Sequence, residues 1–275
     1  MKIKRDEVGG ICDVSIYGRK FPFGTWSDLH EVHDSLLIVA SGPSVAEVNF
    51  SYFENTPMMA VNGAYALALN GKVKFKYFLV VDIDFVKSRT EIVRAALSNP
   101  DLIFFVLLPV LKSILDQIPS QEIRCTILVV EDYYEPIFLK APSRNEVSDS
   151  DAHVSLEDGE PFFSLDARKG VFDAGTVVFW GMQLAVTMGA KNIGLIGVDM
   201  NNFSSPRFYE NEKDIQPTRL DKLFSSIISP RFCAAADMLK KRGVNLYNLS
   251  MCSALSEAHI QKISIDNFKK IAGIS

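Results

Sequence analysis

Seven short runs of consecutive apolar residues restrict the fold of this 275-residue chain more than any other feature. They are rich in β-branched and aromatic side chains and have the length of single strands. A strand that is apolar at successive positions is buried on both faces, as in a parallel sheet covered by helices. The runs are Leu36–Ala40, Met58–Val61, Tyr77–Val81, Leu102–Leu107, Thr126–Val130, Ile193–Ile196 and Val244–Tyr247.

Helix-like stretches separate most of these runs, which predicts an α/β fold with a mostly parallel sheet flanked by helices. Gly189 and Gly243 each follow such a stretch and fit helix C-terminal caps. The stretch Thr176–Met188 is apolar on nearly every side, so we expect a buried, central helix there. The expected helices are Gly63–Asn70, Val86–Ser98, Val110–Gln117, Thr176–Met188 and Arg231–Arg242.

Composition excludes several classes of protein. With 48% hydrophobic residues, the chain can bury a large core and is not disordered. Its 29 Lys and Arg against 33 Asp and Glu give a net charge of −4 without a basic stripe, which disfavours nucleic-acid binding. We expect no secretory signal and no membrane span, and free thiols at the four scattered cysteines, so the predicted location is the cytoplasm.

Two long polar segments, Glu131–Ala167 and Asn201–Pro230, interrupt the alternation of strands and helices. Polar loops of this length inside a domain are usually lids or insertions. We therefore expect an N-terminal extension over residues 1–34 and one domain over residues 35–275. That domain would carry insertions near residues 131–167 and 201–230.

Small or polar residues follow successive predicted strands. Because the carboxyl ends of parallel strands meet at one sheet edge, these residues predict a nucleotide-binding crevice there. Gly42 permits a tight turn and Ser44 can cap a helix, although an ordinary strand-to-helix turn has the same residues. Asn62 with Gly63 likewise fits a simple turn. The full set is Ser41, Gly42, Pro43, Ser44, Asn62, Asp173, Gly175, Thr176, Asn248, Ser250 and Ser253.

Acidic residues also stand at predicted strand ends. Asp82 and Asp84 match the D-x-D pattern with which many glycosyltransferases hold a divalent metal under a nucleotide diphosphate. Asp84 can equally begin the next helix as its cap. Asp199 follows the strand Ile193–Ile196 and suits a sugar hydroxyl, a ribose or a proton transfer, or else a solvated loop.

In this order the motifs resemble those of bacterial enzymes that use CMP-activated acidic sugars. The chain is similar to the lipopolysaccharide-core transferases of 3-deoxy-manno-octulosonic acid (Kdo). More distantly, it resembles the single-domain bacterial sialyltransferases. The matching residues span roughly Ser35 to Ile265 and are Ser41–Ser44, Val61–Gly63, Asp82, Gly175–Thr176, Gly197–Asp199, Arg207–Asn211 and Tyr247–Ser250.

This resemblance implies a Rossmann-like, GT-A-like domain without a resident cofactor, in which the insertion Asn201–Pro230 forms a mobile lid. CMP is a leaving group with one phosphate, so no metal is expected, which weakens the D-x-D interpretation. The expected partners are a CMP-activated sugar donor and a lipopolysaccharide or oligosaccharide acceptor, reached at the inner face of the inner membrane. CMP would bind along Ser41, Gly42, Pro43, Ser44, Asn62, Gly175, Thr176, Asn248, Ser250 and Ser253.

The resemblance departs from the sialyltransferases at one point. Those enzymes use a lid histidine as general base, and the corresponding stretch Ser225–Arg231 contains none. An inverting attack still needs a base near the acceptor hydroxyl. We expect Asp199 or Asp82 in this role, with His153 and Glu210 as alternatives.

The departing phosphate would be stabilised by Arg207 and Tyr209, since a guanidinium offers a bidentate fork to phosphate or carboxylate. An anionic donor requires positive charge nearby, which we expect from Arg207 and from Arg168 or Arg231.

Three other functions remain open from the sequence. One is a sialyltransferase, and another is a metal-dependent transferase that holds a nucleotide-diphosphate sugar at Asp82 and Asp84. The third is a nucleotide-binding module without catalytic activity, an alternative that is consistent with the absence of the lid histidine.

Overall fold

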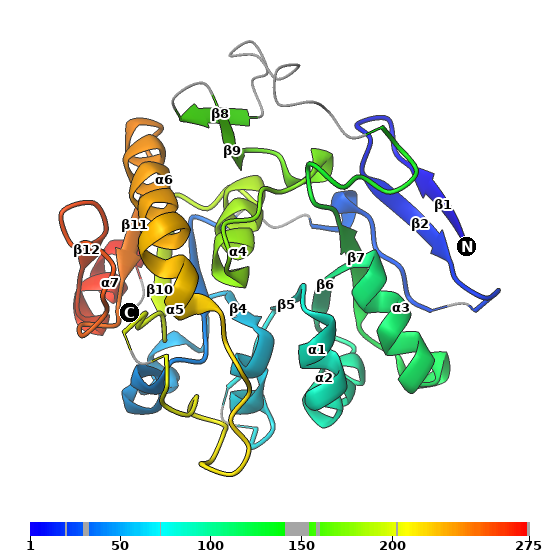
Figure 1. Ribbon diagram of the computed structural model, residues 1–275, viewed down its shortest axis with the longest axis horizontal. Coiled ribbons are helices and arrows are strands. Elements are labelled where there is room, and N and C mark those ends of the chain that lie inside the picture. Colours follow the sequence, from blue (N-terminus) through cyan, green and yellow to red (C-terminus); the bar gives the residue numbers. More distant parts are fainter. Residues whose placement is uncertain are drawn as a thin grey trace.

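The computed structural model describes residues 1–19, 21–29, 33–71, 73–140, 154–157, 160–201 and 203–273. Its centre is an eight-stranded parallel sheet in the order β12-β11-β10-β3-β4-β5-β6-β7 (Figure 1). The predicted α/β fold is confirmed, and each of the predicted apolar runs forms a strand. The strands are β3 (Ser35–Val39), β4 (Met58–Val61), β5 (Tyr77–Val80), β6 (Ile103–Leu107), β7 (Thr126–Val130), β10 (Asn192–Ile196), β11 (Asn245–Asn248) and β12 (Gln261–Lys262).

The order of the strands creates a reversal in the middle of the sheet. The chain runs outward from β3 to β7, returns to β10 on the other side of β3, and continues outward to β12. Val39 of β3 pairs with Ile196 of β10, so the turns that follow these two strands leave the sheet at the same level. Ligands of open α/β sheets bind outside the carboxyl ends of the strands at such a reversal.

Helices cover both faces of the sheet. Successive residues of a strand point to opposite faces, so strands that are apolar at every position make both faces apolar. Leu37 and Val39 share a buried cluster with α1 (Ile83–Ser88), α2 (Thr90–Leu97) and α3 (Leu108–Gln117). Leu36 and Ile38 belong to the cluster on the other face, with α4 (Val177–Thr187) and α6 (Ser229–Lys241) (Figure 1). Phe268 of α7 (Ile265–Ala272) is buried in the first cluster.

Most of the predicted helices form, with shifted boundaries. Gly189 and Gly243 follow α4 and α6 with φ of 86° and 77°, which confirms both as C-terminal glycines. The expected helix over residues 86–98 is wrong as one element, because it breaks at Arg89 between α1 and α2. The expected helix over residues 63–70 is a 3-10 helix, η4 (Asn62–Ala68).

The second polar segment is not loop throughout. Its residues 220–230 form α5 (Leu220–Leu223), a π-helical stretch η8 (Phe224–Ile228) and the start of α6. We therefore call only residues 203–219 the lid segment. Short 3-10 helices complete the chain: η1 (Trp26–Asp28), η2 (Pro43–Glu47), η3 (Phe50–Phe53), η5 (Ser120–Glu122) and η7 (Ala167–Lys169).

Two antiparallel hairpins accompany the sheet. The hairpin of β1 (Lys2–Arg5) and β2 (Ile11–Ser15) lies beside β7, where Arg5 pairs with Glu131 at the end of that strand. The second hairpin joins β8 (Val154–Glu157) to β9 (Glu160–Ser164) within the first polar segment. In the part of the chain that the structure describes, no helix has the length and apolar character of a membrane span.

Candidate active site

A cleft of about 980 Å³ opens at the carboxyl edge of the sheet, next to the reversal between β3 and β10. Its walls are the turns after β3, β4, β5 and β10, the start of α4 and the lid segment. The structure thus brings together most residues that the sequence assigned to a nucleotide crevice. Lining residues with expected roles are Ser41, Gly42, Pro43, Asn62, Asp82, Asp84, Asp173, Gly175, Thr176, Asp199, Arg207, Tyr209 and Glu210.

The turn after β3 is tied to the turn after β10. The Gly42 N–H donates to the Gly197 carbonyl at 2.9 Å, and the Ser44 N–H donates to Asp199 Oδ2 at 3.0 Å. A Cβ atom on Gly42 would lie only 2.5 Å from that same carboxylate oxygen, so glycine is required here for close approach. The expectation that Ser44 caps a helix is wrong, because Gly42 holds the N-cap position of η2 and the Ser44 side chain bonds to Asp199 instead.

Asp199 is a buried carboxylate that joins these two turns. The residue is 6% exposed, and its side chain accepts from both the backbone N–H and the hydroxyl of Ser44. The adjoining Met200 has φ of 55°, a left-handed conformation that is uncommon for a side chain of this kind. Both oxygens of Asp199 are therefore engaged in holding the sheet edge together.

Asn62 begins η4 at the cleft wall with φ of 46°. Its Oδ1 atom is buried and has no hydrogen-bond partner in the described residues. A buried acceptor without a partner is costly. Its place at the wall suits it to accept a hydrogen bond from a ligand hydroxyl or amino group.

Asp82 and Asp84 are exposed at the start of α1. Asp82, not Asp84, is the N-cap, since its Oδ1 accepts from the Asp84 N–H at 2.8 Å. At the start of α4, the Thr176 hydroxyl caps the helix, while the Asp173 carboxylate accepts from Trp180 Nε1 at 2.9 Å. No group of three His, Cys, Asp or Glu residues within the described ranges is arranged to hold a metal ion.

The polar residues at the end of β11 and just after it do not line the cleft. Ser250 Oγ accepts from the backbone N–H of Gly197 at 2.9 Å and of Val198 at 3.2 Å. Ser253 Oγ donates to the Val198 carbonyl at 2.6 Å, and Asn248 Oδ1 accepts from the Ser250 N–H at 2.9 Å. In this structure all of them support the turn that carries Asp199.

The lid segment is docked on the sheet edge through Tyr209 and Glu210. The Tyr209 ring fills the space beside Gly63, where a Cβ atom would stand 1.8 Å from the ring. Burial raises the pKa of the Tyr209 phenol above its usual range, so the hydroxyl stays protonated. The Glu210 side chain is fully buried and accepts from Arg207 Nη1 at 2.6 Å.

Arg89, which the sequence did not single out, anchors this docked lid. It lies between α1 and α2, is 7% exposed, and its Nη2 stands 2.9 Å from Asp214 Oδ2 and 3.8 Å from Glu210 Oε1. Its guanidinium also lies 5.7 Å from the centre of the Tyr209 ring. A lone arginine inside a predicted helix gave no signal of these contacts, which arise from residues more than a hundred positions away.

The expectation that Arg168 or Arg231 supplies positive charge to the cleft is wrong. Arg168 forms a bidentate pair with Asp166 at 2.6 Å, and Arg231 pairs with Glu157 at 2.8 Å. Neither arginine lines the cleft. His153 lies outside the described residues.

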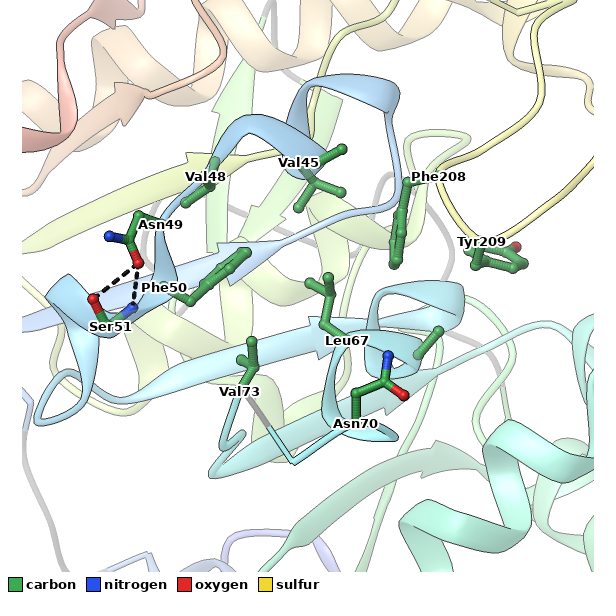
Figure 2. Close-up of a pocket in the computed structure, with 12 residues that line it drawn as sticks. Val45, Val48, Asn49, Phe50, Ser51, Leu67, Asn70, Val73, Phe208 and Tyr209 are labelled. Atoms are coloured by element: carbon green, nitrogen blue, oxygen red, sulfur yellow. Dashed lines mark hydrogen bonds between the residues drawn. The ribbon is translucent and has the colours of Figure 1, made fainter.

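A second cavity of about 810 Å³ shares the Tyr209 side chain with the cleft. Figure 2 shows Phe208 and Tyr209 at one end of it, with their rings 5.4 Å apart in an edge-to-face arrangement. Apolar residues of η2, η3 and η4, such as Val45, Phe50 and Leu67, form most of the wall. The docked lid therefore separates a polar cleft from an apolar cavity.

Comparison with known proteins finds two relatives along most of the chain. A Salmonella typhimurium protein described as a "probable 3-deoxy-manno-octulosonic acid transferase" is 25% identical over 233 residues, 81% of this chain and 84% of its own length. An Escherichia coli K12 protein with the same description is 24% identical over 249 residues, 82% of this chain and 81% of its own length. The expected relationship to these transferases is thereby confirmed.

No protein-family model matches the chain. Among solved structures, the MAf glycosyltransferase of Magnetospirillum magneticum AMB-1 aligns with a TM-score of 0.46 and 12% identity. The alignment covers 88% of this chain and 36% of the length of that chain.

Proposed function

We propose that this protein is a glycosyltransferase that moves Kdo from CMP-Kdo to a lipopolysaccharide acceptor without a metal ion. The observation that carries the proposal is the similarity to two proteins described as probable Kdo transferases, over more than four fifths of the chain. Support also comes from the place of the cleft at the sheet reversal, where α/β enzymes bind nucleotides.

The donor would lie across the cleft with its nucleotide along the turns after β3 and β4. Gly42 and Pro43 present backbone at this edge, and the partnerless Oδ1 of Asn62 would accept from the base or the ribose. Gly175 and Thr176, at the start of α4, form part of the opposite wall of the cleft. Asn248, Ser250 and Ser253 would act by shaping the Gly197–Asp199 turn.

In the reaction, the oxygen of an acceptor hydroxyl attacks the anomeric carbon of the sugar. The bond from that carbon to the phosphate oxygen breaks, CMP leaves with the bonding electrons, and the hydroxyl proton passes to a general base. We propose Asp82 as this base, because it is exposed at the cleft and only its Oδ1 is engaged, as a helix cap. Asp199, with both oxygens bonded, would instead hold the donor-binding turn.

The GT-A-like assignment belongs to the same proposal. It is supported by a single sheet whose one carboxyl edge carries the cleft. We further propose that the enzyme works at the inner face of the inner membrane, where a lipid-linked acceptor would be presented.

A metal-dependent transferase is the second candidate, favoured by the carboxylates in the cleft wall. Asp82, Asp84, Asp173, Asp199 and Glu210 all line it. Carboxylate oxygens are the ligands by which Mg²⁺ is held under a nucleotide diphosphate. Loss of transfer in EDTA, with recovery on adding Mg²⁺ or Mn²⁺, would favour this candidate over the first.

A thermal-shift screen of the full chain with CMP, UDP, GDP, NAD and S-adenosylmethionine tests the proposal. A ligand that binds only the folded state stabilises it and raises the melting temperature, by an amount that grows with the ratio of ligand concentration to dissociation constant. We expect stabilisation by CMP and none by the other compounds. Stabilisation by UDP or GDP alone would reject the CMP donor.

A further inference from the structure

The cleft wall carries an unexpected balance of charge for an enzyme with an anionic donor. Five carboxylates line it, and the only guanidinium groups among its described lining residues are those of Arg207 and Arg219. A CMP-activated acidic sugar brings a phosphate and a carboxylate into this space. One of the two arginines must therefore meet an anionic oxygen of the donor.

Arg207 is already neutralised within the lid segment. Its Nη1 donates to Glu210 Oε1 at 2.6 Å and to the Gln216 carbonyl at 3.3 Å, and its backbone N–H donates to Glu210 Oε2 at 2.9 Å. The Glu210 side chain is fully buried. Turning Arg207 toward a ligand would strip a buried carboxylate of its main partner, which is strongly unfavourable.

Arg89 completes the same buried network from the other side. It contacts Asp214 and Glu210 and lies against the Tyr209 ring, but it does not line the cleft. Arg89 and Arg207 together balance Glu210 and Asp214, two of the three acidic side chains of the lid segment. The positive charges of Arg89 and Arg207 are therefore neutralised by the contacts that hold the lid segment in its docked position.

Arg219 differs from both. It is exposed at the end of the lid segment, directly before α5, and lines the cleft. Within the described part of the chain, its guanidinium has no hydrogen-bond or ion-pair partner, whereas Arg207 has two. An arginine in the cleft wall without an acidic partner keeps its full charge for a ligand.

We propose that Arg219 is the residue that binds the anionic oxygens of the donor, while Arg207 and Arg89 hold the lid in its docked position. The proposal rests on the function proposed above, and it reassigns the phosphate-binding role expected for Arg207. Arg219 is thus the specificity-determining residue for an acidic donor, and Arg207 and Arg89 are positioning residues.

Isothermal titration calorimetry of the full chain with cytidine, CMP and CMP-Kdo tests this assignment. We expect Arg219→Gln to weaken CMP or CMP-Kdo binding roughly 10- to 100-fold, the range of a lost charge-assisted hydrogen bond, while cytidine binds as before. Arg219→Lys should recover part of the affinity. Lys222→Gln is the matched control, because this exposed lysine lies three residues further on and does not line the cleft.

The ligands separate the two anionic groups. Weaker binding of CMP by Arg219→Gln assigns Arg219 to the phosphate, and weaker binding of CMP-Kdo alone assigns it to the sugar carboxylate. Unchanged binding of both, or an equal loss for cytidine, overturns the proposal. For Arg207→Gln we expect equal losses of affinity for cytidine and CMP, since the lid segment is released. A loss of affinity confined to CMP would also overturn the proposal, because it would place Arg207 on the phosphate.

The same titrations with UDP separate this inference from the donor assignment. If the wild-type protein binds UDP but not CMP, and Arg219→Gln weakens UDP binding, the CMP donor is rejected and the role of Arg219 stands. If the wild-type protein binds none of these nucleotides, both the CMP donor and the role of Arg219 are overturned.

Discussion

Replacing Gly63 with alanine should undock the lid. The new Cβ atom would stand 1.8 Å from Tyr209 Cε1 and 2.6 Å from its hydroxyl oxygen, so the ring cannot stay in its slot. Leaving the slot exposes part of a large aromatic side chain and breaks its contact with the Arg89 guanidinium. These losses together amount to about 2 kcal/mol of docking free energy.

Hydrogen exchange at the lid measures this quantity directly. The Phe208 N–H donates to the Ser41 carbonyl at 3.3 Å, so its protection depends on the docked lid. A loss of about 2 kcal/mol corresponds to roughly 30-fold faster exchange through local opening. The free energy of global unfolding should change less, because the lid can leave while the sheet stays folded.

A double-mutant cycle provides the control. In a Tyr209→Ala background, Gly63→Ala has no ring to displace, and alanine in a helix is favourable over glycine by about 0.5–1 kcal/mol. The two substitutions should therefore show a coupling energy of about 2 kcal/mol. Wild-type exchange rates in Gly63→Ala alone, or additive effects in the double mutant, would refute the docked position of Tyr209.

Three further outcomes follow from the structure. Gln183→Leu should lower the free energy of unfolding in urea by about 3–5 kcal/mol, since it strands two buried N–H groups and a carbonyl that this side chain satisfies; an unchanged midpoint would contradict this. Burial raises the pKa of Cys125 to about 12, so iodoacetamide at pH 8 should modify the exposed Cys252 but reach Cys125 only after unfolding. Asp82→Asn should lower turnover at least 100-fold with CMP affinity retained, whereas Asp199→Asn should weaken CMP binding as well; equal CMP affinities in both variants would speak against the separate roles.

The sheet and the place of the cleft could be predicted because they follow from short-range patterns. Strands such as Tyr77–Val80 are buried on both faces, so every residue had to be apolar. Polar residues that follow parallel strands lie at one edge of the sheet. This rule predicted that Asn62 and Asp199 lie at the cleft. The two-residue strand β12 was missed because it is too short to show any pattern.

The details of the cleft wall depend on partners that are distant along the chain. Nothing near Ser44 indicates that Asp199 will bind it, 155 positions away. The contacts of Arg89 are equally distant along the chain, since its ion pair with Asp214 spans 125 positions. Arg168 differs, because its partner Asp166 stands only two residues before it, a local signal that our interpretation of the sequence overlooked.

The most direct test of the central claim is a transfer assay with the purified full chain, CMP-Kdo and a Kdo-containing lipopolysaccharide core acceptor. Mass spectrometry of the acceptor and quantification of released CMP follow both products. We predict that the acceptor gains one Kdo residue for each CMP released, in the presence of EDTA and with CMP-sialic acid inactive as donor. An unchanged acceptor with CMP-Kdo, together with transfer from CMP-sialic acid or from a nucleotide-diphosphate sugar, would contradict the account.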